Sequence, residues 1–172
     1  MLLVIHKFHQ LSFSELVRVY SESLSQDIHD DDRSRAYHEQ MREAEQEFCD
    51  YLNAVFFRQK NACYVVLEEN GRYISALRLE PYMDGFLICA LETAPEFRRK
   101  GFAKKLMRET VSFLSESSDG KLYSHIAKNN TASLVLHEKC GFITIKDYAR
   151  YLDGSVFHDH VTMLYEYRKT ES

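Results

Sequence analysis

A basic turn at residues 98–103 is the stretch of this sequence best suited to binding an anion, and it leads from an apolar run into a helical pattern. Pro95 ends the apolar run 86–91, because proline lacks the N–H that a central strand needs. Gly101 and Ala103 let a ligand approach the backbone, and a helix start presents unpaired N–H groups to it. Five positive side chains surround the same point: Arg98, Arg99, Lys100, Lys104 and Lys105. The turn is therefore predicted to bind phosphate.

Two well-known phosphate loops do not fit this turn. The P-loop needs a second glycine followed by lysine and serine or threonine, and the dinucleotide fingerprint needs three glycines. The turn instead resembles the pyrophosphate loop of the GNAT superfamily of acyl-CoA-dependent N-acyltransferases, in which Arg or Gln is followed by two residues, Gly, one residue and Gly or Ala. Arg98, Gly101 and Ala103 meet that pattern, with Pro95 three residues before it. The alternative is a basic helix start that binds nothing.

A second stretch, 130–142, is similar to a later motif of the same family. Asn130 is followed three positions later by the small Ser133, and the stretch closes with Gly141 and Phe142. His137 stands where the family most often has Tyr. Asn130 is expected to cap a helix that Gly141 ends. Two motifs in the family's order make the resemblance firm over residues 60–167 and looser upstream.

The composition predicts one soluble globular domain spanning residues 1–172, because the 172 residues are 45% hydrophobic and 28% charged. The lack of an apolar run of 18 residues predicts no membrane span, and the run 2–5 is too short for a signal-peptide core. Four cysteines without a Cys-x-x-Cys pair predict free thiols, no metal site and a cytoplasmic location. His158 and His160 lack a third metal ligand nearby and are expected on a loop surface.

The periodicity predicts a mixed α/β sheet of about seven strands with about four helices. The strands are expected at 2–8, 64–68, 73–79, 86–91, 122–127, 143–151 and 161–167. The helices are expected from Ser12 or Ser14 through Leu24, over 34–56, after the basic turn and after Asn130. Turns at 70–71 and 153–154 are typical of hairpins. The resemblance implies a GNAT-like fold, in which two central strands splay and acyl-CoA enters the gap.

The resemblance also implies which residues bind acetyl-CoA. Backbone N–H groups of 99–104 would hold the pyrophosphate, the central strand would pair with the pantetheine, and residues of the later motif would contact it. The implied cofactor-binding residues are Leu91, Thr93, Arg98, Arg99, Lys100, Gly101, Phe102, Ala103, Lys104, Asn130, Ser133 and His137.

The sequence defines the general acid and the general base of the acetyl transfer less fully than the cofactor-binding residues. The resemblance implies that His137 donates a proton to the leaving thiolate, and the alternative is a packing side chain; Tyr148 and Tyr151 are further donors. Glu92 could serve as base if a bulge redirects it, and a water-relayed base is equally admissible. The base therefore stays unassigned.

The acidic connector before the long helix, which includes Asp27, Asp30 and Asp31, would favour a cationic acceptor such as a polyamine, an aminoglycoside or lysine. The alternative is a solvated charge run. We expect N-acetyl transfer from acetyl-CoA to a primary amine of a small molecule by direct attack. A protein N-terminal or lysine acetyltransferase and a non-catalytic acyl-CoA sensor remain alternatives. With a net charge of −4, nucleic acid is not expected as a partner, and a homodimer is one assembly that the sequence allows.

Overall fold

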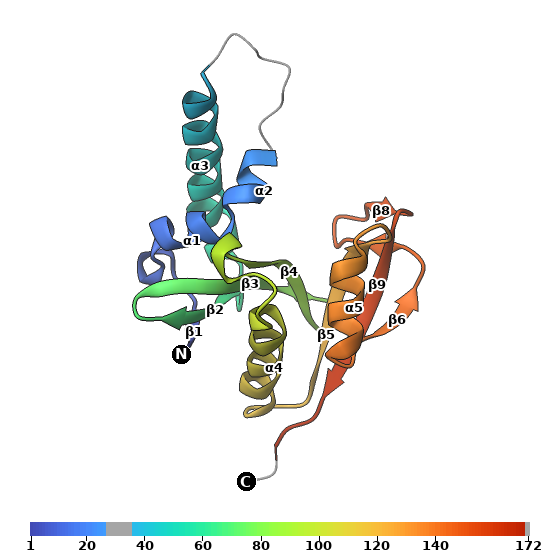
Figure 1. Cartoon of the computed structure of the whole chain (residues 1–172). Helices are drawn as coiled ribbons and strands as arrows, with labels where there is room; N and C mark the ends of the chain where they lie inside the picture. Colours follow the sequence, from blue (N-terminus) through green and yellow to red (C-terminus); the bar gives the residue numbers. More distant parts are fainter. Residues whose placement is uncertain (27–35, 171–172) are drawn as a thin grey trace.

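A seven-stranded sheet forms the centre of the molecule in the computed structural model, which describes residues 1–26 and 36–170 (Figure 1). Its strands run in the order β1-β2-β3-β4-β5-β9-β6. They are β1 (Leu2–Ile5), β2 (Cys63–Glu69), β3 (Arg72–Tyr82), β4 (Gly85–Thr93), β5 (Gly120–Ala127), β6 (Ile143–Lys146) and β9 (His160–Tyr167). Only β4 and β5 pair in parallel, and a separate two-stranded sheet joins β7 (Ala149–Arg150) to β8 (Val156–Phe157).

Helices cover both faces of the β1–β4 half of the sheet (Figure 1). Within the described residues they are α1 (Phe13–Val19), α2 (Ser21–Gln26), α3 (Tyr37–Ala54), α4 (Phe102–Ser115) and α5 (Thr131–Lys139). Alternate residues of β2 divide between two cores, since Val65 packs with Leu106 of α4 and Val66 packs with Leu16 of α1. Of α3 only Leu52 is buried, and the rest of that helix rises away from the sheet.

The sheet opens between β4 and β5, because these two strands pair only over Phe86–Ile88 with residues 122–124. The cause lies in the pairing of β3 with β4, where Ala90 and Leu91 both lie opposite Leu77. Ala90 adopts φ = 48°, which is unusual for a residue with a side chain. The hydroxyl of Tyr20 donates a hydrogen bond of 2.6 Å to the carbonyl of Ala90. This bulge bends β4 away from β5.

The seven predicted strands are confirmed, with changes at their ends. The strand predicted at 143–151 ends at Lys146, and the turn at 153–154 instead joins β7 to β8. The strand predicted at 2–8 ends at Ile5, and a short 3-10 helix follows at Phe8–Gln10. The first predicted helix is divided at Tyr20, whose backbone leaves helical geometry (φ −96°, ψ 11°), so five helices are described rather than four.

The hairpin turn at Asn70 and Gly71 is confirmed, with φ of 54° and 79°, which are the left-handed values that this turn needs. No helix within the described residues is long and apolar enough to cross a membrane.

The short paired segment of β4 and β5, where the opening ends, requires the two strands to approach closely at Gly85. A Cβ atom there would overlap the main-chain oxygen of Lys121. Gly85→Ala should therefore lower the free energy of unfolding by about 1–3 kcal/mol, measured by urea titration. The control Ser112→Ala, at an exposed site on α4, should change it by less than about 0.5 kcal/mol. Equal stability of Gly85→Ala and the native protein would contradict this role.

Candidate active site

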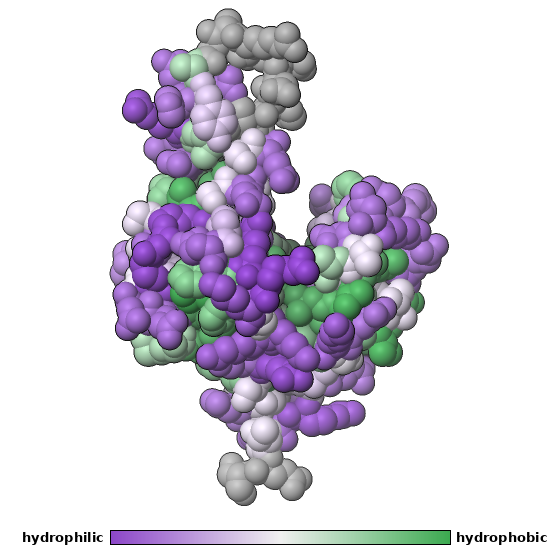
Figure 2. All heavy atoms as spheres, viewed as in Figure 1, coloured by the Kyte–Doolittle hydropathy of each residue, from purple (hydrophilic) through white to green (hydrophobic). Residues whose placement is uncertain are grey.

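A cavity of about 680 Å³ fills the opening between β4 and β5. Figure 2 shows that the surface is hollowed between the arm carrying α2 and α3 and the arm carrying α5. Its walls come from α2, α3, β3, β4, β5, α5 and β9. Polar and reactive side chains line it: Ser23, Tyr51, Arg78, Glu80, Cys89, Glu92, Ser124, His125, Asn130, Ser133, His137, Tyr151 and His160. The opening is thus a pocket lined by polar groups.

A second cavity, of about 390 Å³, lies at the start of α4. It is lined by most of the residues predicted to hold the pyrophosphate, and Leu91 and Glu92 line both cavities. Gly101 is the N-cap of α4 with φ = 83°, and a Cβ atom on it would meet nothing within 4 Å. The backbone can therefore be approached closely here, beside the positive end of a 14-residue helix.

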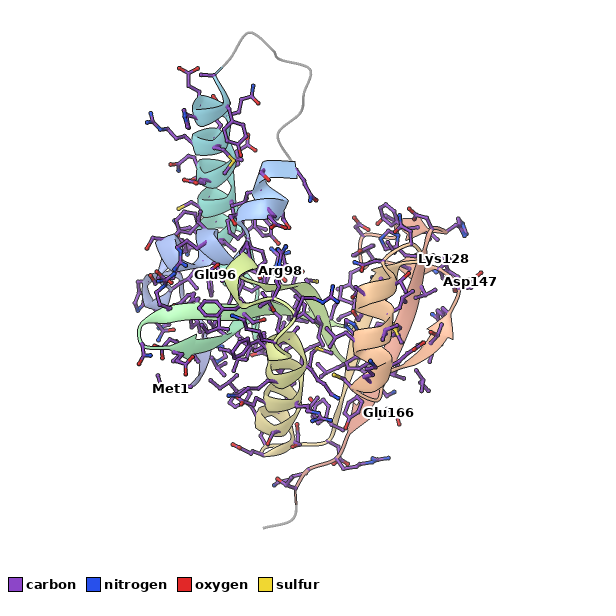
Figure 3. All side chains as sticks on the ribbon, in the orientation of Figure 1. Met1, Glu96, Arg98, Lys128, Asp147 and Glu166 are labelled. Atoms are coloured by element: carbon purple, nitrogen blue, oxygen red, sulfur yellow. The ribbon has the colours of Figure 1, made fainter. Side chains whose placement is uncertain are left out.

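Two of the predicted basic residues are held by protein groups. Arg98 donates from Nε to the carbonyl of Thr93 at 3.0 Å, and its guanidinium pairs with Glu22 of α2. Figure 3 shows Arg98 at the start of the loop that precedes α4, next to α2. Lys100 donates to the carbonyl of Glu96 and does not line the second cavity. Of these two residues, therefore, only Arg98 lines the second cavity.

The start of α5 has the predicted form. The Asn130 side chain accepts a hydrogen bond of 3.1 Å from the backbone N–H of Ser133, which caps the helix. Gly141 lies just past its end with φ = 92°. Asn130 and Ser133 both line the large cavity, so the structure brings the second motif to the same opening as β4.

His137 is buried, with 2% of its surface exposed. Its Nδ1 lies 2.8 Å from the carbonyl oxygen of Ser133, and because a carbonyl only accepts, Nδ1 carries the proton. Nε2 then presents a lone pair, and it is buried without a hydrogen-bond partner in the described structure. Burial lowers the pKa of His137, although the bond to Ser133 raises it. The neutral ring is suited to accept a hydrogen bond rather than to donate a proton.

Of the two tyrosines considered as donors, the structure places only Tyr151 at the cavity. Its ring contacts His125 edge-on, with centroids 4.7 Å apart. Tyr148 does not line the cavity, and its ring lies beside His158 instead. The difference follows from the early end of β6 at Lys146, which leaves Tyr151 to begin the turn between β7 and β8.

Glu92 lies beside the bulge, where the two cavities adjoin. With regular alternation its side chain would lie on the opposite face of β4 from Leu87 and Cys89. The extra residue at Ala90 shifts the register by one position, so Glu92 lines the same cavity as those two residues. Glu92 accepts a hydrogen bond from the hydroxyl of Ser23, and its carboxylate lies 4.0 Å from the guanidinium of Arg98. Burial raises the pKa of the neighbouring Cys89 to about 12, so that thiol stays neutral.

Several lining residues were not predicted from the sequence, among them Arg78 and Glu80 on β3 and His125 on β5. His160, expected on a loop surface, instead begins β9 and lines the cavity. Both ring nitrogens of His125 are buried without a hydrogen-bond partner in the described structure, and Tyr82 and Tyr151 contact the ring edge-on. Burial lowers the pKa of His125 to about 4, with further lowering by His160 and Lys146. Arg78 and Glu80 are two residues apart on one strand, and side chains at that spacing lie on the same face of a sheet. That spacing is the feature of the sequence that could have indicated a charged pair.

The predicted acidic substrate site, Asp27, Asp30 and Asp31, lies outside the described residues. Over residues 1–26 and 36–170, no group of three or more His, Cys, Asp or Glu side chains could hold a metal ion.

The neutral His125 should make stability sensitive to acid. Its pKa is about 4 in the folded protein against about 6.5 when unfolded, so its stabilising effect is present above pH 6.5 and is lost as the pH falls towards 4. His125→Gln removes this titration, so between pH 6.5 and pH 4 its free energy of unfolding should fall by about 1–2 kcal/mol less than that of the native protein. The difference is smaller than the full pKa shift implies, because cavity water screens part of the effect. Urea titrations at several pH values measure it, with exposed His158→Gln as control. An unchanged acid slope in His125→Gln would contradict this assignment.

Comparison with known proteins places this geometry in a family. The profile of the Acetyltransferase (GNAT) family matches residues 24–142. The fold is similar to PaiA N-acetyltransferase from Thermoplasma acidophilum in complex with coenzyme A (13% identity, TM-score 0.61, covering 97% of this chain and 99% of that one). It is also similar to Campylobacter jejuni N-acetyltransferase PseH in complex with acetyl coenzyme A (15%, 0.60, 96% and 99%).

A third similar structure is the ribosomal-protein-S18-alanine N-acetyltransferase from Escherichia coli (17% identity, TM-score 0.58, covering 100% of this chain and 97% of that one). No curated protein sequence matches the chain significantly. The profile match spans more than half of the 172 residues, and these structures share the fold from end to end. The chain therefore belongs to the GNAT family of acetyltransferases.

Proposed function

We propose that this protein transfers an acetyl group from acetyl-CoA to a primary amine of a small molecule. The observation that carries the proposal is the meeting of two cavities at the β4 bulge, one beside the glycine loop of α4 and one reaching into the β4–β5 opening. The larger, at about 680 Å³, lies in the size range of pockets for small ligands. Donor and acceptor can thus enter from different directions and meet at Glu92.

The start of α4 fits the pyrophosphate of the donor. Its first N–H groups and the open space at Gly101 provide a backbone cradle, and the Arg99 and Lys104 side chains line the same cavity. No β4–β5 pair beyond Ile88 is found in the described part of the chain, so the edge of β4 at Leu91 and Thr93 is available to pair with the pantetheine arm. Asn130 and Ser133 face that arm from α5.

When bound, acetyl-CoA supplies the acetyl group, and transfer forms a C–N bond to the amine as the C–S bond breaks and the electron pair leaves with sulfur. In our proposal Glu92 takes the proton released by the amine, and Tyr151 supplies a proton to the sulfur. The Nε2 lone pair of His137 accepts a hydrogen bond from the pantetheine arm rather than donating a proton.

The acceptor is proposed to be an amine because two similar structures are named as N-acetyltransferases of amines. One is named for the alanine of a ribosomal protein, and the other, a chimera of the Vibrio cholerae protein and hSSAT, for spermidine. Glu80 and Glu92 in the cavity suit an acceptor that carries a positive ammonium before it reacts. Cysteines 49, 63, 89 and 140 are free thiols, which suits the cytoplasmic location that we propose.

Substitution at the α4 loop tests donor binding. Gly101→Trp fills the space in front of the helix start and should weaken acetyl-CoA binding at least about a hundredfold, because several charge-assisted hydrogen bonds are lost together. Isothermal titration calorimetry measures it. Gly154→Trp is a matched control, since Gly154 has a similar φ of 90° and equally open surroundings but lies far along the chain in a turn. Undiminished binding by Gly101→Trp would contradict the loop assignment.

The proton-transfer roles are tested by release of free thiol. Glu92→Gln and Tyr151→Phe should each lower kcat by about a hundredfold while leaving acetyl-CoA affinity unchanged, because each removes a proton acceptor or donor but little volume. Exposed Glu138→Gln on α5 is the control and should keep full turnover. Native turnover in either active-site variant would reject the role given to that residue.

A further inference from the structure

A charged pair, Arg78 and Glu80, lies in the large cavity on the β3 side of the bulge. Arg78 is opposite Cys89 in the β3–β4 register, one residue before the bulged Ala90. Among the described residues that line this cavity, Arg78 is the only lysine or arginine. A single permanent positive charge therefore faces the acceptor's part of the opening.

Arg78 has more hydrogen-bond donors than its described neighbours use. Its side chain is 17% exposed, and its Nε is buried without a hydrogen-bond partner. Its guanidinium carbon lies 5.2 Å from the ring centre of Tyr51 and 5.6 Å from that of Phe56, contacts that involve the face of the group. Glu80 is its ion-pair partner, at 3.5 Å from Nε. The five N–H groups of a guanidinium donate in its plane, so contacts between its face and aromatic rings do not use them. N–H groups of Arg78 are therefore left to donate to a ligand.

A purely structural role explains this arrangement poorly. Burying an arginine costs free energy unless good geometry and further hydrogen bonds compensate, and the contact to Glu80 is too long to be a strong hydrogen bond. The planar fork of arginine matches a carboxylate, which can accept two parallel hydrogen bonds. A doubly charged phosphate is less suitable than a singly charged carboxylate, because Glu80 and Glu92 line the same cavity and would repel the larger charge more strongly.

We propose that the acceptor is an amine that also carries a carboxylate, as an amino acid does, and that Arg78 binds the carboxylate while Glu80 faces the ammonium end. This inference rests on the proposed acetyl transfer and names its substrate class. It makes Arg78 a residue that determines specificity, because it separates such acceptors from plain amines of the same size.

The test uses matched pairs of amines with the native full-length protein and saturating acetyl-CoA. Each pair is an amino acid and its decarboxylated amine: lysine with cadaverine, tyrosine with tyramine, and arginine with agmatine. Thiol release gives kcat/KM for both members. For the pair that the protein accepts, the native protein should prefer the carboxylate-bearing member by about tenfold to a hundredfold. Arg78→Gln should abolish that preference while acetyl-CoA binding, measured by calorimetry, stays unchanged.

Two further variants keep the result interpretable. Arg78→Lys retains the charge but not the planar fork, so it should keep part of the preference and most of the stability. Exposed Arg58→Gln controls for the general loss of one positive charge and should keep the native preference.

The outcomes separate this inference from the proposed function. Thiol release with equal kcat/KM for both members of every pair, or a preference that survives in Arg78→Gln, would overturn the role of Arg78 and leave the acetyltransferase proposal standing. Thiol release with none of the amines, despite acetyl-CoA binding, would overturn the proposed function and this inference together.

Discussion

The bulge at Ala90 is the constraint on which the rest of the site depends. Two residues of β4 face one residue of β3 there, and the backbone of Ala90 enters a region of φ that a side chain disfavours. Such a conformation persists only where the surroundings hold it, and the hydrogen bond from Tyr20 at the end of α1 does so. Because β4 turns away here, its parallel pairing with β5 ends at Ile88 and the sheet opens.

Helices α1 and α2 are joined to the end of β4 and the loop before α4 by polar contacts, in addition to the apolar core that they share with β2 and β3. Glu92 accepts from Ser23 of α2, Arg98 pairs with Glu22, and Arg18 of α1 pairs with Glu96 before α4. Half-exposed ion pairs contribute little to stability, in general below about 1 kcal/mol each. Their effect is geometric, since they place α1 and α2 over the junction of the two cavities. The α4 loop and the large cavity are thereby linked by one connected set of contacts.

Features encoded within a few consecutive residues could be predicted from the sequence. The loop 98–103, the cap of α5 by Asn130 and the turn at Asn70 and Gly71 depend on local backbone chemistry, and each is found where it was expected. The seven strands followed from apolar runs in the same way. Local patterns therefore predicted the structure of the segments that we propose to bind the donor.

The proposed acceptor side of the cavity could not be predicted in this way. β3 is buried on both faces over most of its length, so its pattern does not reveal which face carries Arg78 and Glu80 into the cavity. That depends on the register beyond the bulge, which is a contact between distant segments. The tautomer of His137 and the choice of Tyr151 over Tyr148 likewise depend on distances that no spacing encodes.

Hydrogen–deuterium exchange with and without acetyl-CoA tests the central claim most directly, because it reports backbone amides along the chain. If donor and acceptor meet at the bulge, acetyl-CoA should slow exchange at amides 99–104 at the start of α4 and at 90–93 of β4, and leave the β2–β3 hairpin unchanged. Binding that leaves both segments unprotected, or that protects only residues away from the β4–β5 opening, would contradict the account.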